Sequence, residues 1–319
     1  MSKNDIELRP QYLNQYIGQS NIINNLNIFI NAAKKRNEVL DHCLIYGPQG
    51  LGKTTLANVI ANEMGSDFKS ITAVSLDKVK DLINILITIN PGDTLFIDEI
   101  HRLSKSCMEA LYSAMEDYYV DIIYGQNENI KTIRVDIQPF TLIAATTKIN
   151  MINKPLKDRF GIKLKLDYYS EEDIIKIIKR TAKVYDTKID NKACKSIANK
   201  SRLTPRIANN YFKRIRDFAS ILNDNFITLE ICNNAFKDMK INNDGLEEFD
   251  ILYLDILIRL YNGGPCGINT LAANLNCDID TIESIYEPYL IQKELIKKTN
   301  RGRVITSYGI EYFNNLERL

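Results

Sequence analysis

In the first half of the chain, short apolar runs alternate with stretches whose apolar residues recur at helical spacing. The runs rich in apolar residues are 43–46, 94–97, 140–147 and 162–166. Such runs are typical of strands buried in a parallel sheet. The stretches at helical spacing are 20–36, with Ser20 placed to cap it, 56–63, 75–89 and 104–118. This alternation predicts an α/β domain.

Residues 120–137 break this alternation. Two segments with alternating apolar positions flank a polar turn, which is typical of a β-hairpin. The hairpin falls outside the expected sheet and carries Ile122, Ile123 and Ile133. Two interpretations stay open at this point. The hairpin is either part of the core or a protruding ribbon that binds a partner.

From Ser170 the pattern becomes helical, and 190–200, 205–221 and 228–239 are the clearest helices. Beyond a polar linker at 242–245, helices at 249–261, 268–275 and 280–291 precede a basic hairpin. Three short helices followed by a β-wing form a winged helix. The predicted domains are therefore 1–168, an α/β domain; 169–243, a small helical lid domain; and 244–319, a winged-helix domain.

The amino-acid composition excludes only a few classes of function. The chain has 319 residues, 45% of them apolar, and a net charge of +1, so any contact with DNA must come from a local patch. The six cysteines are scattered and only two histidines are present, which argues against a zinc site. No apolar run approaches the length of a membrane span, and the N-terminus lacks a signal peptide. We expect a cytoplasmic protein without a membrane partner.

Residues 47–55 fit the phosphate-loop pattern G-x-x-x-x-G-K-[ST], between a predicted strand and a predicted helix. Glycines let backbone N–H groups surround an anion, and the helix N-terminus faces it. Lys53 is placed to reach the β- and γ-phosphates of ATP, and Thr54 to hold Mg²⁺. The loop residues expected at the nucleotide are Gly50, Leu51, Gly52, Lys53, Thr54 and Thr55.

Two further strands end in polar residues. Asp98 and Glu99 follow one apolar run, and Thr146 and Thr147 end the next. Open α/β sheets bind ligands at this edge. We assign Asp98 to Mg²⁺ and Glu99 to activation of the attacking water. Either threonine is a candidate to sense the γ-phosphate or to hold that water.

Basic residues gather in the predicted wing, at Lys297, Lys298, Arg301 and Arg303. A wing tip is well placed for contacts with DNA phosphates. The alternative is a solvated basic turn on a winged helix that binds protein. We favour the contact with DNA.

Taken together, these motifs resemble the RuvB family of AAA+ ATPases. The segments that carry the resemblance are 8–10, 47–58, 95–103, 115–117, 140–147, 158–162, 204–209, 216–219, 287–292 and 301–303. The resemblance implies an ATP-driven motor of Holliday junction branch migration in recombination, DNA repair and the SOS response to DNA damage. It also implies a hexameric ring on double-stranded DNA, RuvA bound through hairpin 120–137, and RuvC as an indirect partner.

The resemblance also implies roles for single residues. Arg159 is similar to an arginine finger that acts in the neighbouring subunit, and Arg206 to a second sensor in the lid. Thr146 or Thr147 is similar to the first sensor. The family's DNA contacts fall on Lys298 and Arg303. Its nucleotide-pocket positions fall on Leu8, Arg9, Ile17, Glu116, Asp117, Tyr118 and Tyr169.

The chain departs from the family pattern at Gln49, Ala144, Lys157, Leu203 and Lys298, none of which removes a catalytic group. Two other functions compete with the motor. One is a clamp-loader-like AAA+ ATPase switch on DNA, and the other is a winged-helix regulator that only senses ATP. A winged helix in place of a helical collar disfavours the first, and an intact Glu99 and Arg159 disfavour the second.

Overall fold

The computed structural model describes residues 8–76, 78–124 and 131–316. They form two compact units, each described here by itself. The first unit runs to Gly47 and continues from Leu51 to Asp167. The second joins Pro48–Gly50 to the chain from Tyr168 onward. No helix in the described ranges is both long and apolar enough to cross a membrane.

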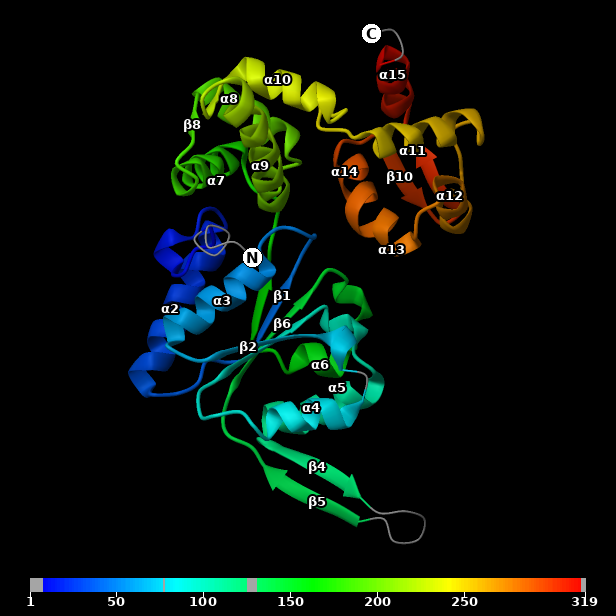
Figure 1. The fold of residues 1–319 in the computed structure, drawn as a ribbon. Coiled ribbons are helices and arrows are strands. Elements are labelled where there is room, and N and C mark those ends of the chain that lie inside the picture. The colour runs from blue at the N-terminus through cyan, green and yellow to red at the C-terminus, as the bar shows by residue number, and fades with distance from the viewer. Residues whose placement is uncertain (1–7, 77, 125–130, 317–319) are drawn as a thin grey trace. The chain divides into compact units, whose positions relative to one another are not determined.

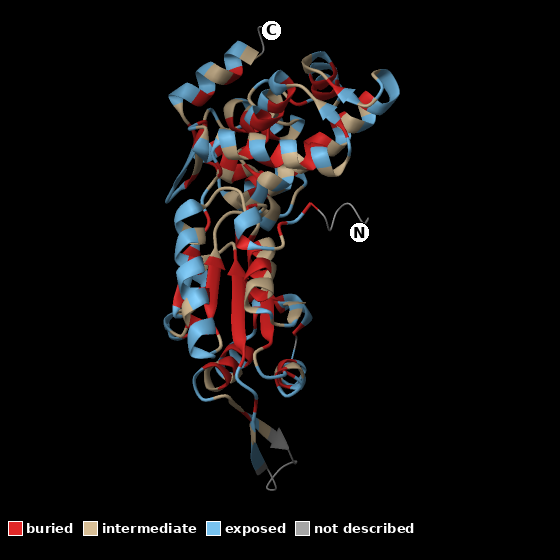
Figure 2. Cartoon of the chain, turned by 90° about the vertical axis from the view of Figure 1, so that its left-hand side faces the viewer, coloured by how far each residue is buried: buried red, intermediate tan, exposed pale blue. Residues whose placement is uncertain are grey.

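The described part of the first unit is built on a parallel sheet in the order β2-β3-β6-β1-β7. Its strands are β1 (Cys43–Tyr46), β2 (Phe68–Thr72), β3 (Thr94–Asp98), β6 (Thr141–Thr146) and β7 (Ile162–Lys165). The central strands are buried along almost their whole length (Figure 2). The predicted parallel sheet is confirmed. Edge strand β2 lies outside the apolar runs because its side chains are only half-buried or exposed.

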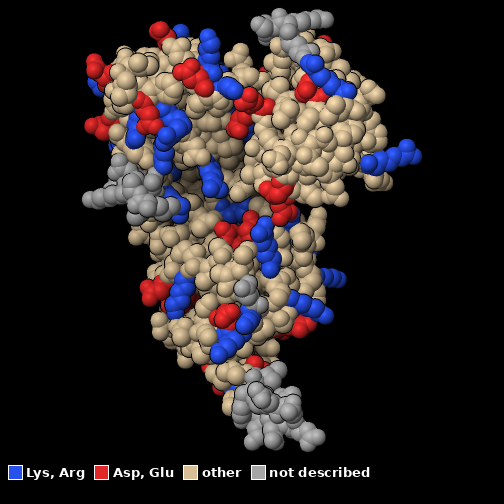
Figure 3. All heavy atoms as spheres, turned by 45° about the vertical axis from the view of Figure 1, so that its right-hand side comes forward, with Lys and Arg blue, Asp and Glu red and all other residues tan. Residues whose placement is uncertain are grey.

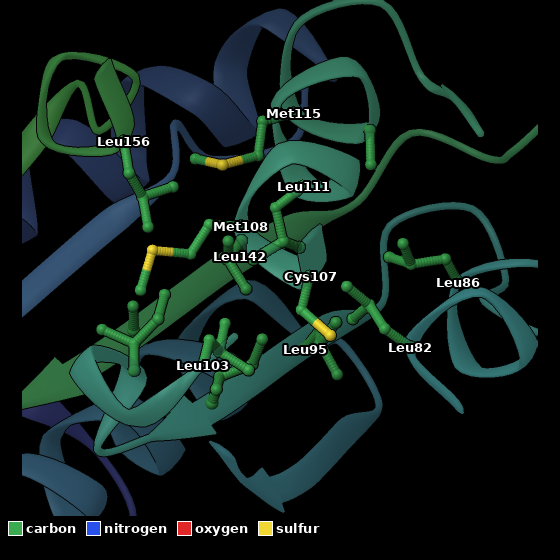
Figure 4. Packing of buried hydrophobic residues seen from close by; sticks show 14 of the residues in the cluster. Leu82, Leu86, Leu95, Leu103, Cys107, Met108, Leu111, Met115, Leu142 and Leu156 are labelled. Carbon is green, nitrogen blue, oxygen red and sulfur yellow. The ribbon is translucent and has the colours of Figure 1, made fainter. Parts of the chain in front are cut away.

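Helices cover both faces of this sheet (Figure 1). They are α2 (Ser20–Arg36), α3 (Lys53–Met64), α4 (Val79–Leu86), α5 (Lys105–Glu116) and α6 (Lys154–Asp158). Figure 4 shows Leu82 and Leu86 of α4 and Leu111 of α5 lying near Leu95 of β3 and Leu142 of β6. Burial of these side chains fixes α4 and α5 on one face of the sheet.

Two local expectations are wrong. Ser20 is the first residue of α2 and not its cap; the residue before it, Gln19, has a φ of 53° and no side-chain cap. The expected helix 75–89 is a 3₁₀ turn (Ala73–Ser75) followed by the shorter α4. Lys78 precedes α4 in extended conformation, and its N–H is 3.3 Å from the Asp81 carboxylate. Further 3₁₀ turns are Leu13–Gln15, Ile100–Arg102 and Ile149–Met151.

The hairpin forms a separate antiparallel pair, β4 (Tyr119–Tyr124) and β5 (Lys131–Asp136), which projects from the first unit (Figure 1). Its base joins the core through Val120, which is 2% exposed. Farther out, Ile122 pairs with Ile133, and Ile133 is 48% exposed. The hairpin thus has a core base and an exposed arm. The predicted turn, 126–129, lies outside the described residues.

The second unit begins with a helical bundle. Its helices are α7 (Glu171–Val184), α8 (Asn191–Lys200), α9 (Pro205–Leu222) and α10 (Leu229–Asp238), with short strands β8 (Lys188–Ile189) and β9 (Phe226–Ile227). Ser170 accepts a hydrogen bond from the Asp173 N–H at 3.1 Å, so this helix start is confirmed. Pro205 opens α9 because its fixed φ suits a first turn.

The winged helix follows in the same unit. It comprises α11 (Glu248–Arg259), α12 (Ile268–Leu275), α13 (Ile279–Thr281), a π-helical turn (Ile282–Tyr286), α14 (Glu287–Gln292), strands β10 (Ile296–Thr299) and β11 (Gly302–Ile305), and α15 (Ser307–Leu316). The stretch 280–291 is therefore not one regular helix. In the wing, Gly302 has a φ of 135°, and a Cβ there would lie 2.3 Å from Cys266 O, so only glycine fits.

A buried ion pair joins the bundle to the winged helix within this unit. The Arg202 guanidinium lies 2.5 Å from Asp250, and their side chains are 4% and 0% exposed. Arg202 also donates to Gly245 O at 3.1 Å and stacks on the Tyr289 ring. Burial raises the pKa of Asp250 to about 6, although Arg202 opposes that shift. The bundle and the winged helix are thus joined by more than the linker.

Candidate nucleotide and DNA sites

The phosphate loop leads from β1 into α3. Gly52 precedes the helix with a φ of 96°, a conformation that L side chains rarely adopt. Lys53 opens α3, and its Nζ donates back to Gly47 O at 2.9 Å. Burial lowers the pKa of Lys53, while Glu99 and Asp98 oppose this shift. A buried ammonium therefore stands at a helix N-terminus, beside two carboxylates.

Two hydroxyls follow in the first turn of α3. Thr54 and Thr55 are half-buried, whereas Leu51, before Gly52, is fully buried. The register of the sheet pairs Tyr46 of β1 with Thr146 of β6. The phosphate loop and the end of β6 therefore lie at the same edge of the sheet, as expected for parallel strands.

Asp98 ends β3, and Glu99 begins a tight turn. The Glu99 N–H donates to Asp98 Oδ1 at 3.0 Å, and Glu99 has a φ of 51°. A non-glycine residue in this region costs about 1–3 kcal/mol and is often found at functional sites. Burial and the neighbouring Glu99 raise the pKa of Asp98, and Lys53 opposes them. The turn thus presents two carboxylates to the phosphate loop.

Thr146, which ends β6, and Thr147, which follows it, differ in their environment. Thr146 is fully buried; its Oγ1 lies 3.0 Å from His101 Nδ1 and accepts from the Lys148 N–H at 3.0 Å. Thr147 is half-buried, and its hydroxyl and N–H donate to Glu99 Oε2 at 3.1 and 3.2 Å. Thr147 is therefore the threonine that contacts the acidic turn directly.

Arg159 follows α6 and lies with a different set of residues. Its Nη2 donates to Glu116 at 2.9 Å, its Nη1 donates to Pro155 O at 2.9 Å, and its guanidinium stacks on Tyr112. Nε is buried without a hydrogen-bond partner among the described residues. None of these contacts comes from the cluster of Lys53, Asp98 and Glu99. The structure thus brings Arg159 and Glu116 together, and these contacts do not involve Lys53, Asp98 or Glu99.

The remaining nucleotide-pocket positions of the first unit are spread more widely. Leu8 is buried, Ile17 is half-buried, and Arg9 and Asp117 are exposed. The Tyr118 ring packs edge-on against Phe140, and burial raises its pKa.

In the second unit, a pocket of about 300 Å³ is lined by Gly50, Tyr168, Thr204 and Arg206, among others. The Arg206 N–H, at the start of α9, donates to Gly50 O at 3.4 Å. Tyr169 is instead buried, and its N–H donates to Leu203 O at 3.1 Å. Gly50, Arg206 and Tyr168 thus line the same pocket, and Tyr169 is not among its lining residues.

The wing has two kinds of basic residue. Arg303 is only 12% exposed and pairs with Glu287 at 2.8 Å and Glu283 at 2.6 Å. Lys298 lies 2.6 Å from Glu287. Burial alone would raise the pKa of Glu287, but the hydrogen bonds from Arg303 and Lys298 hold it below its usual value. Arg301, at the turn, is exposed. One buried carboxylate therefore holds both strands of the wing.

Family models match the three parts of the chain. Residues 8–166 match the Holliday junction DNA helicase RuvB P-loop domain, 169–242 the RuvB AAA lid domain, and 243–314 the RuvB C-terminal winged helix domain. The chain belongs to the RuvB family.

Individual RuvB proteins agree along nearly the whole chain. The Holliday junction branch migration complex subunit RuvB of Staphylococcus haemolyticus is 48% identical over 98% of this chain and 95% of its own length. That of Phytoplasma mali is 50% identical over 97% and 93%. The RuvB Holliday junction branch migration motor of Thermotoga maritima superimposes with a TM-score of 0.88 at 43% identity, covering 96% of this chain and 98% of the other.

Two side chains near this site, those of His101 and Tyr112, were not predicted from the sequence to contribute to it. His101 lies in the turn that follows Glu99, and its contact with Thr146 forms because β3 and β6 lie side by side in the sheet. The only feature of the sequence that points to Tyr112 is its position on α5, one turn before Glu116. The contact of His101 with Thr146 and that of Tyr112 with Arg159 join residues distant in sequence, so local sequence patterns do not predict them.

Proposed function

We propose that this chain is the motor subunit that couples ATP hydrolysis to branch migration of Holliday junctions. One observation carries the proposal: a phosphate-loop lysine, an acidic turn and a polar strand end meet in a chain whose three parts all match RuvB models. A clamp-loader-like switch gains no support from those matches. The fold alone would leave the function open.

The residues present fit ATP with Mg²⁺. A buried Lys53 at a helix N-terminus suits phosphate oxygens. A hydroxyl at Thr54 and a carboxylate at Asp98 are the oxygen donors that Mg²⁺ prefers, and the metal neutralises developing charge on the phosphates. Arg206 and the loop residues around Gly50 complete the proposed nucleotide contacts. Leu8, Arg9, Ile17, Asp117, Tyr118 and Tyr169 remain further candidates.

In the proposed hydrolysis step, Glu99 accepts a proton from the attacking water. Thr147, whose hydroxyl contacts Glu99, is our choice for the sensor over the buried Thr146. Arg159 acts as a finger on the nucleotide of a neighbouring subunit, because its own contacts lie elsewhere. This arrangement requires a ring, which by family resemblance is a hexamer.

The proposed partners follow from the same resemblance. RuvA binds the exposed arm of β4–β5, and RuvC joins indirectly. The winged helix contacts double-stranded DNA through Lys298, Arg301 and Arg303. Opposite charges are interspersed on the face shown in Figure 3, so a local contact accounts better for binding than a global field. The setting is DNA repair in the bacterial cytoplasm, including the SOS response.

Steady-state ATP hydrolysis tests this function. We expect weak activity from the chain alone, a rise with duplex DNA, and a further rise with a four-way junction plus RuvA, because the finger must be supplied by a neighbour in a ring. An ATP hydrolysis rate that changes neither with DNA nor with RuvA would favour a nucleotide switch. No ATP hydrolysis under any condition would reject the motor.

The wing gives a second prediction. Arg301→Ala should weaken duplex binding and lower the slope of log affinity against log salt by about 1, since one phosphate contact is lost. The melting temperature should not change, because Arg301 is exposed. Fluorescence anisotropy at several salt concentrations measures the slope.

Arg303→Ala is the matched comparison. It leaves Glu287 buried with one partner fewer, so we expect a loss of stability on the order of 3 kcal/mol, together with weaker DNA binding. Equal stability loss in both variants, or an unchanged salt slope for Arg301→Ala, would remove Arg301 from the DNA contacts.

A further inference from the structure

We propose that Glu283 competes with DNA phosphates for two cations of the wing, Lys298 and Arg303, and so lowers the affinity of the winged helix for duplex DNA. This inference rests on the proposed DNA contact of the wing. Four charged side chains carry it, two from the wing and two from the helical segment 282–292. The last part of that segment, α14, packs beside β10 (Figure 1).

The two cations need a counter-ion in the wing itself. Lys298 and Arg303 are direct partners in the register of β10 and β11, and like charges in such positions destabilise a strand pair. Glu287 offsets their repulsion, since it lies 2.6 Å from Lys298 Nζ and accepts from Arg303 Nε at 2.8 Å. Its side chain is 0% exposed and also accepts from the Tyr253 hydroxyl at 3.0 Å. Glu287 is thus a structural counter-ion at a position that a phosphate cannot reach.

Glu283 is the second carboxylate of this group, and it differs from Glu287 in exposure. It lies in the π-helical turn Ile282–Tyr286, about one turn before Glu287, and its side chain is 32% exposed. Oε1 of Glu283 accepts from Arg303 Nη2 at 2.6 Å and lies 3.5 Å from Lys298 Nζ. The same two cations therefore have another acceptor, which is partly open to solvent.

The charges of the four side chains cancel. Glu287 offsets one of the two positive charges, and Glu283 offsets the other. A DNA phosphate offers Lys298 and Arg303 anionic oxygen acceptors of the same kind as the Glu283 carboxylate. A phosphate must therefore displace Glu283 before these cations can bond to it at full strength.

An internal competitor suits a protein that must release DNA repeatedly. Phosphate contacts carry no sequence information, so their strength governs how tightly a wing is held at any position on the duplex. Because Glu283 binds Arg303 and Lys298 again when a phosphate leaves, it lowers the cost of release. Most of its effect should appear in the dissociation rate, as for most changes at an interface.

The test measures duplex binding of the full chain by fluorescence anisotropy, with ATP and Mg²⁺ at fixed concentrations. We expect Glu283→Gln to raise the affinity by about 3-fold to 10-fold, mainly through slower dissociation, since a further phosphate contact becomes available. The slope of log affinity against log salt should become steeper by about 0.9. Glu283→Ala should give the same result, because the gain comes from loss of the carboxylate. Both variants should fold, since Lys298 and Arg303 keep Glu287.

Glu311→Gln is the matched control. Glu311 is exposed on α15, and no ion pair involves it within the part of the chain that the structure describes. The substitution changes the net charge by the same amount as Glu283→Gln, so it measures the effect of overall charge alone. We expect its affinity for duplex DNA and its salt slope to equal those of the unsubstituted chain.

Three results would overturn the inference. One is an affinity of Glu283→Gln for duplex DNA that is unchanged or lower. Another is an equal gain in Glu311→Gln, which would assign the effect to overall charge. The third is a gain with Gln but not with Ala, which would mean that the new amide itself contacts DNA. Failure of the proposed function gives a different result, since the unsubstituted chain would then not bind duplex DNA at all.

Discussion

Glu99→Gln should abolish steady-state ATP hydrolysis and leave ATP binding intact. The amide keeps the shape of the side chain but cannot accept a proton from water, and loss of a general base typically costs about 10²-fold to 10⁴-fold in rate. Gln can still accept hydrogen bonds from Thr147, so the turn at φ 51° should survive. Single-turnover kinetics, with binding of a fluorescent nucleotide, measure the two properties separately.

Glu109→Gln is the matched control for this prediction. Glu109 lies on α5 with its side chain 56% exposed, where it pairs only loosely with Lys105 at 3.8 Å. We expect unchanged turnover. If Glu99→Gln keeps its turnover, Glu99 is not the base and the water must be activated elsewhere. If the variant loses ATP binding as well, the carboxylate is needed for the nucleotide site and the roles of Asp98 and Glu99 must be exchanged.

The sequence predicted the elements of this fold best where burial imposes a pattern. β1, β3 and β6 are buried on both faces, so they appear as continuous apolar runs. Edge strand β2 is half-exposed and has no such run. The helix expected at 75–89 was too long because apolar spacing continues through a 3₁₀ turn, while Lys78 and Asp81 set the true start.

The site was predicted in part, for a related reason. Lys53, Asp98 and Glu99 belong to local motifs with fixed spacing. Their residue types and positions are therefore enough to predict a phosphate-binding site from the sequence. The choice between Thr146 and Thr147 depends on contacts across strands. Burial of Thr146 and the 3.1 Å bond from Thr147 to Glu99 became visible only in three dimensions. In the same way, the sequence predicts a basic Arg303 in the wing but does not show that its side chain pairs with the buried carboxylate of Glu287.

Arg159→Ala should lower ATP hydrolysis by about 10³-fold to 10⁵-fold, the range of effects expected of an arginine finger. The substitution also frees Glu116 and uncovers the Tyr112 ring, but Glu116 is exposed, so little stability should be lost. Fluorescent nucleotide binding should persist. A loss of binding equal to the loss of turnover would place Arg159 in the nucleotide site itself.

Mixed rings decide whether the finger acts in trans. A complete site needs Glu99 from one subunit and Arg159 from its neighbour. Equimolar mixing of Arg159→Ala and Glu99→Gln chains therefore restores roughly one quarter of the sites if subunits assemble at random through a head-to-tail interface. Mixing Arg159→Ala with a chain that carries both substitutions should restore nothing, since neither supplies the arginine. If both mixtures stay inactive although mass spectrometry shows mixed rings, Arg159 acts on the nucleotide of its own subunit, and hydrolysis would no longer require a neighbour's finger.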